Sequence, residues 1–231
     1  METIEITPNL RMLRFEVGQA YLWRDGDELT LVDTGPAGSG PGIAAAIRGP
    51  GMGRHRLRRV VLTHFHEDHA GSAAEIGAWG DVEVMAHRLE APVVRGEVPG
   101  PPPVLEDWER PIRDALPPLP PAPPARVDRE LEDGDVIGFG GGAVVVATPG
   151  HTDGSLAVHL PAHGVLFTGD TVAHMEGRVM LGVFNLDRAR AASSFRRLAG
   201  LDVRTACFGH GDPIVKGAAE RMRAVVRDLP A

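Results

Sequence analysis

Residues 60–71 read VVLTHFHEDHAG, in which three histidines and two acidic residues fall within six positions directly after an apolar run. Residues two apart on an extended chain project from the same face, so His64 and His66 can contact the same ion. We expect the strand to turn into a helix at Asp68 and His69, which brings two more donors close to the first pair. Imidazole nitrogens and carboxylate oxygens are ligands for zinc, iron and manganese. Because four donors exceed the usual three protein ligands of a catalytic metal site, the stretch favours two metals that share one cluster.

Three further donors stand at expected strand ends in the second half of the chain. They are His151 in TPGHTDGS, Asp170 in FTGDT and His210 in FGHGD. Glycine flanks each of them and gives the backbone room to turn tightly. With the first four they make seven donors, the number that a binuclear site with one bridging carboxylate needs. The sequence therefore predicts two divalent cations, with zinc as the default and iron or manganese also compatible with these ligands.

Short apolar runs separated by turn residues predict alternating strands and helices in both halves of the chain. We expect strands at 10–17, 20–25, 29–35, 57–64 and 82–87, with helices near 42–48 and 69–78. The second half repeats the pattern, with strands at 143–151, 155–161, 164–170 and 203–210 and helices at 187–200 and 213–229. In each half one strand ends on an aspartate, Asp33 or Asp170, and a later strand ends on a histidine, His64 or His210. Two such halves packed sheet to sheet would bring these strand ends together.

Residues 99–124, PGPPPVLEDWERPIRDALPPLPPAPP, are dense in proline. Proline fixes φ and removes a backbone donor, so the flanks of this segment should be extended connectors and not sheet. Two interpretations stay open: a surface linker between the halves of one domain, or a lid in which Leu105 and Trp108 cover a pocket. We expect residues 1–231 to form a single domain that carries this segment as an insertion or crossover.

The composition narrows the classes of partner. A formal net charge of −7, with Lys216 as the only lysine, disfavours nucleic acid and anionic membranes. The single cysteine, Cys207, excludes an internal disulfide framework and fits a reducing compartment. The N-terminus lacks a signal-like apolar stretch, so we expect a cytoplasmic protein that acts on a small-molecule substrate. The sequence shows no determinant of oligomeric state, and a homodimer is one arrangement that it allows.

The motifs THFHEDHAG, TPGHTDGS, LFTGDT and CFGHG, in this order, resemble those of the metallo-β-lactamase-fold hydrolase superfamily, and the likeness begins at LVDTG and covers nearly the whole chain. The resemblance implies an α/β fold, a four-layer αββα sandwich of two mixed β-sheets flanked by helices, with the metal site at one sheet edge. It implies that His64, His66 and His151 bind the first metal, that Asp68, His69 and His210 bind the second, and that Asp170 bridges them. Asp33 would not bind a metal itself but would orient one of the metal-binding side chains.

The pair Asp68 and His69 is more similar to the glyoxalase II and lactonase branches than to the β-lactamases proper. The sequence departs from both branches, however. It shows no added C-terminal helical domain of the kind that binds glutathione in glyoxalase II. Ala173 and His174 stand where lactonases of acyl-homoserine lactones tend to have a tyrosine.

These features predict a binuclear metal-dependent hydrolase in which a metal-bridging hydroxide attacks an ester, thioester or lactone carbonyl. Asp68 would relay a proton to the leaving group, and His174, four residues after Asp170, is a candidate for substrate contact. A phosphodiesterase or nuclease with the same metal site is one alternative, which the acidic balance disfavours. An oxidoreductase similar to the mononuclear-iron persulfide dioxygenases is another, which the full set of seven donors disfavours.

Overall fold

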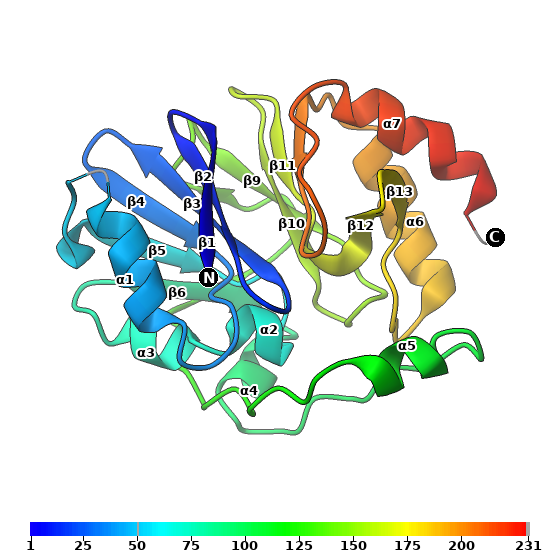
Figure 1. Cartoon of the computed structure of the whole chain (residues 1–231), viewed down its shortest axis with the longest axis horizontal. Helices are drawn as coiled ribbons and strands as arrows, with labels where there is room; N and C mark the ends of the chain where they lie inside the picture. Colours follow the sequence, from blue (N-terminus) through cyan, green and yellow to red (C-terminus); the bar gives the residue numbers. More distant parts are fainter. Residues whose placement is uncertain (50, 230–231) are drawn as a thin grey trace.

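The first sheet takes its seven strands from the N-terminal part of the chain in sequence order (Figure 1). We describe a computed structural model of the protein that covers residues 1–49 and 51–229. The strands are β1 (Glu2–Thr7), β2 (Leu10–Arg14), β3 (Gln19–Asp25), β4 (Glu28–Val32), β5 (Leu57–Val61), β6 (Glu83–His87) and β7 (Arg129–Leu131). Neighbours from β1 to β4 are antiparallel, whereas β4 to β7 run parallel, so the sheet is mixed.

The second sheet has five strands in the order β14-β11-β10-β9-β8. Their bounds are β8 (Val136–Ile137), β9 (Ala143–Ala147), β10 (Leu156–Leu160), β11 (Val165–Phe167) and β14 (Thr205–Cys207). All pairs are antiparallel except β11 with β14. A separate hairpin of β12 (Val172–Met175) and β13 (Arg178–Leu181) follows the short 3₁₀ turn η2 (Gly169–Thr171). This hairpin was not predicted from the sequence.

Both sheets are covered on both faces, because successive side chains of a strand point to opposite sides. On β3, Tyr21 packs between the sheets and Leu22 packs under α1 (Gly40–Arg48) and α3 (Ala73–Gly77). On β10, Val158 faces the other sheet, and Ala157 packs with Phe195 of α6 (Arg188–Ala199), beside α7 (Ala218–Val225). Helices therefore flank two facing sheets (Figure 1), which confirms the predicted four-layer αββα fold.

Two predicted helices differ from the observed ones. The helix expected at 69–78 is split into α2 (Glu67–Ala70) and α3, because the chain at Gly71 passes close to residues 36 and 37. A Cβ on Gly71 would lie 2.4 Å from the Ala37 nitrogen, and the Ser72 hydroxyl donates to the Pro36 carbonyl. The helix expected at 213–229 begins only at Ala218, after the left-handed Gly217, and ends in the 3₁₀ turn η3 (Val226–Asp228).

The proline-rich insertion runs from α4 (Ala91–Val94) to β7 and contains one short helix, α5 (Arg110–Ala115). In Figure 1 it crosses beneath both halves of the molecule. Its two ends meet at the base, where the Ala125 amide donates to the Val94 carbonyl at 2.8 Å. At its middle, Glu109 is 1% exposed and accepts a hydrogen bond from the Phe184 amide, in the loop after β13. The insertion is therefore attached to both halves. No helix of the described residues has the length and apolar character that crossing a bilayer requires.

Candidate metal centre

The seven predicted donors lie together at one edge of the two sheets, in the loops that follow β5, β9, β11 and β14. They form three overlapping groups, within each of which the donor atoms lie within 4.8 Å of one another. The groups are His64 with His66 and His151, His64 with His69 and Asp170, and Asp68 with His69 and His210. Because the groups share His64 and His69, the donors form one continuous cluster. Segments about 150 positions apart in the chain converge here, as the sandwich of two similar halves requires.

Three histidines form the more buried side of the cluster. His64 and His151 are 1% and 2% exposed, and the rings of His64, His66 and His151 lie with their centroids 4.7 Å apart in edge-on pairs. The Nε2 atom of His151 is 3.0 Å from Nδ1 of His66. Burial and the neighbouring rings lower the pKa of His66 to about 3, and burial likewise lowers the pKa of His64 and His151. These rings are therefore neutral at pH 7 and offer lone pairs to a cation.

Carboxylates dominate the other side of the cluster. The His210 Nε2 lies 3.2 Å from both Asp68 and Asp170, and the His69 Nε2 lies 3.2 Å from Asp170. Burial would lower the pKa of both histidines, but the carboxylates outweigh it: the pKa of His210 rises to about 10 and that of His69 also rises. Burial would raise the pKa of Asp68 and Asp170, and the two histidines hold it well below the ordinary value instead.

Asp33 fixes the orientation of ligands from behind the cluster. It is 2% exposed, with a left-handed φ of 60°, and its Oδ2 accepts hydrogen bonds from His69 Nδ1 at 2.9 Å and from the Thr63 hydroxyl at 2.8 Å. Since the Thr63 hydroxyl proton is used on Asp33, its oxygen accepts from His64 Nδ1 at 3.0 Å. Nδ1 of both His64 and His69 is therefore held as a donor, and Nε2 of each ring is directed into the cluster. Because the pKa of His69 is raised, a cation that binds there must displace the proton on its Nε2.

The donor set fits divalent cations. Four buried polar atoms of the cluster lack a hydrogen-bond partner among the described residues: Nε2 of His64, Nε2 of His69, Nδ1 of His151 and Oδ1 of Asp170. Buried polar atoms without a partner are costly, and a bound cation would satisfy them. A mixed set of imidazoles and carboxylates suits zinc, manganese or iron. The assignment of each donor to a metal stays a prediction.

Replacing Asp33 with asparagine should weaken metal binding by about 10–100-fold, the usual cost of losing a residue that orients a ligand. All three groups that contact the Asp33 carboxylate are donors, so either orientation of the amide places its NH₂ against a donor. The zinc affinity is measured by titrating zinc into the metal-free protein in the presence of a chelating indicator that reports the free zinc. Asp27→Asn, an exposed aspartate at the β3–β4 turn, is the matched control. Equal affinities of the two variants would contradict the orienting role.

Glu90 joins the loops that carry the three-histidine side, although sequence analysis did not identify it. It is 1% exposed, and its carboxylate accepts from the Phe65 amide at 2.9 Å, the Thr152 hydroxyl at 2.9 Å and the Gly154 amide at 2.8 Å. These partners flank His66 and His151. Burial raises the pKa of Glu90 to about 7, against the lowering effect of these hydrogen bonds.

The raised pKa of Glu90 predicts a pH-dependent stability. Between the ordinary value of 4.5 and about 7, the folded protein holds a proton that the unfolded chain has released, so the free energy of unfolding falls as pH rises. A shift of this size corresponds to about 3 kcal/mol. The side chain of Glu90→Gln cannot titrate, so this variant serves as the reference. The unfolding free energy of the wild type minus that of the variant should fall by about 3 kcal/mol between about pH 4 and about pH 8. Urea denaturation of the metal-free proteins measures it.

Glu97→Gln, an exposed glutamate after α4, is the control for this comparison. Its unfolding free energy should follow that of the wild type at every pH. A constant difference between wild type and Glu90→Gln across the window would show that Glu90 does not titrate there.

His174, the other predicted catalytic residue, lies outside the three donor groups. Its Nδ1 donates to the Asp212 carbonyl at 2.6 Å, and its Nε2 accepts from Arg221 at 3.0 Å. Its amide also donates to the His210 carbonyl at 3.2 Å. Nδ1 and the amide thus hold the segment that carries His210, and Nε2 is engaged with Arg221 of α7. The substrate contact predicted from the sequence would require one of the two ring bonds to break.

Comparison with known proteins agrees with this geometry. The probable metallo-hydrolase YflN of Bacillus subtilis (strain 168) is 33% identical over 202 residues, which cover 80% of this chain and 75% of YflN. The hydroxyacylglutathione hydrolase of Fuscovulum blasticum is 33% identical over 158 residues, and the match covers 67% of this chain but 49% of that enzyme. A metallo-beta-lactamase family protein of Thermus thermophilus has the same fold, with a TM-score of 0.70 at 24% identity over 97% of this chain and 80% of that one.

The family model of the metallo-beta-lactamase superfamily matches residues 13–210. This range begins in β2, ends on the last of the seven donors and includes both sheets' central strands. The named relatives are a metallo-hydrolase and a glyoxalase II-type hydrolase, which supports a hydrolase here as well. The fold, the cluster and these similarities agree: the chain belongs to the metallo-beta-lactamase superfamily.

Proposed function

We propose that the protein is a hydrolase that uses two divalent cations, most simply zinc, to cleave the carbonyl bond of an ester, thioester or lactone. The observation that carries this proposal is the single cluster of seven donors, four of whose buried atoms make no hydrogen bond among the described residues. The similarity to a hydroxyacylglutathione hydrolase supports an acyl substrate. The substrate would be a small molecule.

Each donor has a place in this scheme. His64, His66 and His151 would hold one cation, and Asp68, His69 and His210 would hold the other, with Asp170 between them. Divalent cations in such a site polarise a carbonyl and supply water of lowered pKa. The chain's own contribution is orientation: Asp33 and Thr63 direct the two Nε2 atoms into the cluster, as described above.

Asp68 is the group best placed to carry a proton. Its side chain is 12% exposed, and its Oδ2 lies 3.2 Å from the His210 Nε2. In the reaction the oxygen of water bonds to the carbonyl carbon, the C–O or C–S bond breaks, and a proton of the water passes through Asp68 to the leaving group. A carboxylate is rarely protonated at pH 7, so Asp68 can pass on the proton of the water but holds almost none of its own to give. Substrates whose leaving group needs little protonation, thioesters above all, therefore suit the site best.

Elemental analysis of the purified protein, followed by a panel of thioesters, esters, lactones and phosphodiesters, tests the proposal. We expect about two metal ions per chain and hydrolysis of carbonyl substrates that a chelator abolishes and added zinc restores. Hydrolysis of phosphodiesters alone would replace the proposal with a phosphodiesterase. A single iron with oxidation of a persulfide would replace it with an oxidoreductase.

A further inference from the structure

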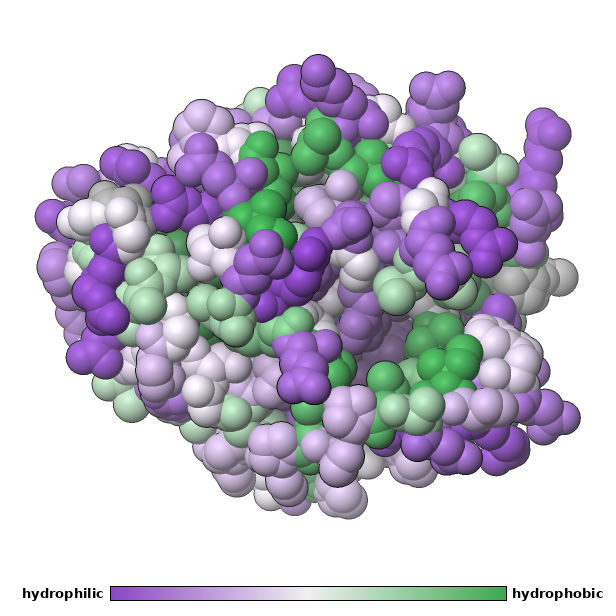
Figure 2. Space-filling view, viewed as in Figure 1, coloured by the Kyte–Doolittle hydropathy of each residue, from purple (hydrophilic) through white to green (hydrophobic). Residues whose placement is uncertain are grey.

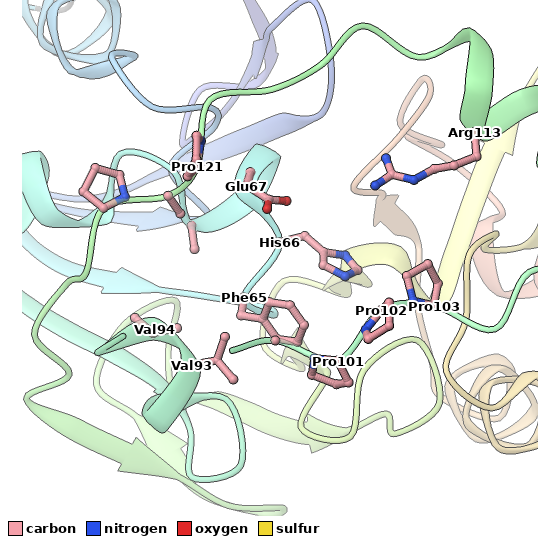
Figure 3. A pocket seen from close by; sticks show the side chains of 14 residues that line it. Phe65, His66, Glu67, Val93, Val94, Pro101, Pro102, Pro103, Arg113 and Pro121 are labelled. Atoms are coloured by element: carbon pink, nitrogen blue, oxygen red, sulfur yellow. The ribbon is translucent and has the colours of Figure 1, made fainter. Parts of the chain in front are cut away.

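A cavity of about 300 Å³ lies beside the cluster and has His66 in its wall (Figure 3). This volume is at the lower end of the range for small-molecule sites. One side of the cavity is formed by the cluster's own segment, the other by α4 and by the proline-rich insertion. In the space-filling view the surface is hollowed between the body of the molecule and the insertion (Figure 2). A molecule that occupies the cavity therefore lies against a predicted metal ligand.

Apolar side chains form one part of the cavity wall. Phe65, Val93 and Val94 line it together with the consecutive prolines 101–103 of the insertion (Figure 3). The insertion packs directly on the Phe65 ring, since a Cβ built on Gly100 would lie 2.4 Å from it. The insertion thus forms a cavity wall, as the lid interpretation required, but through its prolines and not through Leu105 and Trp108, neither of which lines the cavity.

Two charged side chains face the cavity, Arg113 from α5 and Glu67 from α2. They flank His66 (Figure 3). No acidic group of the described residues lies within ion-pair distance of Arg113, although Arg110 on the same helix pairs with Asp107. The Glu67 carboxylate disfavours an anion on its own side of the cavity. An anionic group inside the cavity is therefore drawn to the side of Arg113.

Arg113 is exposed to solvent, and its guanidinium contacts one aromatic ring. Its guanidinium lies over the ring of Phe184, 5.9 Å from the centroid, within the range of a cation–π contact. Phe184 has a φ of 60°, which is rare for a residue with a side chain, and its amide donates to buried Glu109 at 3.1 Å. The other oxygen of Glu109 accepts from the Glu106 amide at 3.0 Å. One buried carboxylate thus holds both the loop that carries Phe184 and the start of α5.

From this arrangement we propose that Arg113 binds a carboxylate of the substrate while the apolar wall receives the adjoining hydrocarbon. The inference rests on the proposed function and narrows it: the substrate is an ester or thioester that carries a second negative charge away from the reacting carbonyl. A singly charged carboxylate matches the paired donors of one guanidinium. A phosphate dianion fits less well, because Glu67 faces the same space.

The kinetic test compares thioesters that differ only in one terminal group. Glutaric acid joined through one carboxyl to N-acetylcysteamine is matched with the same thioester whose free carboxylate is a carboxamide. A second pair of thioesters carries the carboxylate or the carboxamide on the thiol half of the molecule and not on the acyl half. We expect the wild type to prefer the carboxylate in at least one pair, and Arg113→Gln to reduce that preference, as the ratio of kcat/KM, by about 10–100-fold through KM. Arg113→Lys should restore part of it.

Arg110→Gln removes a positive charge from the same helix outside the cavity and is the matched control, which should keep the wild-type preference. An unchanged preference in Arg113→Gln would overturn the proposal. So would an equal loss on the carboxylate and carboxamide thioesters, because that result would mean that Arg113 only holds the insertion in place.

A binding measurement separates this inference from the proposed function. Calorimetry with glutarate, which is not a substrate, requires no turnover. We expect glutarate to bind the metal-loaded wild type and Arg110→Gln equally, and Arg113→Gln about tenfold or more weakly. If no ester is hydrolysed but this pattern holds, the proposed function fails and the carboxylate site stands. If thioesters are hydrolysed but glutarate binds all three proteins equally, or none, the carboxylate site is overturned.

Discussion

The Asp170→Asn variant should lose at least about a hundredfold of its activity toward carbonyl substrates and much of its bound metal. Loss of a residue that only orients a metal ligand lowers metal affinity or activity by about 10–100-fold. Asp170 is itself a member of the donor cluster, so its loss should cost more. Its carboxylate oxygens lie within 3.9 Å of ring nitrogens from four histidines, His64, His69, His151 and His210. Asparagine keeps the volume but removes the charge that would lie between two cations. We expect metal content, measured by elemental analysis, to fall from about two ions per chain to one or fewer.

Asp153→Asn is the control for this prediction. Asp153 lies two residues after His151, but its side chain is 60% exposed and pairs with Arg190 on the surface. Both its metal content and its activity should match those of the wild type. If Asp170→Asn retained two metals and full activity, Asp170 would not be a ligand and the binuclear site would need another bridge.

Gly209→Ala should inactivate the protein to a similar extent, although it replaces none of the seven donor residues. A Cβ at this position would lie 1.9 Å from Oδ1 of Asp170 and 2.8 Å from Cε1 of His69, so both side chains must move. Displacements of about 1 Å cost on the order of a hundredfold in rate, and overpacking costs about 1–3 kcal/mol of stability. Gly209 is buried, and its amide donates to the Gly169 carbonyl at 3.0 Å, so the backbone has little freedom to yield.

The control here is Gly138→Ala, where an added Cβ meets nothing within 4 Å and the backbone conformation is one that alanine adopts. Metal content, hydrolysis and urea denaturation of the two variants are compared. A fully active Gly209→Ala protein with two bound metals would show that the cluster can relax around the new methyl group, contrary to the close packing described here.

The cluster was largely readable from the sequence because its donors stand where strands end. His64, His151 and His210 each follow an apolar run, and such runs, when they pair side by side, place their ends at a common edge. The alternation of strands and helices in both halves favoured two packed sheets, whereas the four-layer αββα arrangement was predicted from the resemblance of the motifs to the metallo-β-lactamase-fold superfamily. Element boundaries were less readable: the close passage at Gly71 splits a helix, and it depends on residues 36 and 37.

Other contributors to the site were not readable. Glu90 follows β6, and only the pairing of β6 with β5 places it under the Phe65 amide. Arg113 lies in a proline-rich segment whose sequence leaves its path undetermined, and Phe184, whose ring it contacts, lies far along the chain. The substrate contact predicted for His174 stays a prediction, and its bonds to Asp212 and Arg221 were not foreseen, because the hairpin of β12 and β13 was not predicted. These residues act through contacts between distant segments, which no local pattern encodes.

The hydrogen bond between Val94 and Ala125 affects how far the length and sequence of the insertion can change during evolution. It closes the insertion at its base, so the intervening residues form a loop whose ends are already joined within the body of the protein. Lengthening such a loop is cheap, since each doubling costs only about 0.6 kcal/mol of closure entropy. Residues in it other than the buried Glu109 can be inserted, lost or exchanged while the strand pairing of β6 with β7 is undisturbed. Substitutions in the insertion can therefore change the substrate preference proposed above at little cost to the stability of the fold.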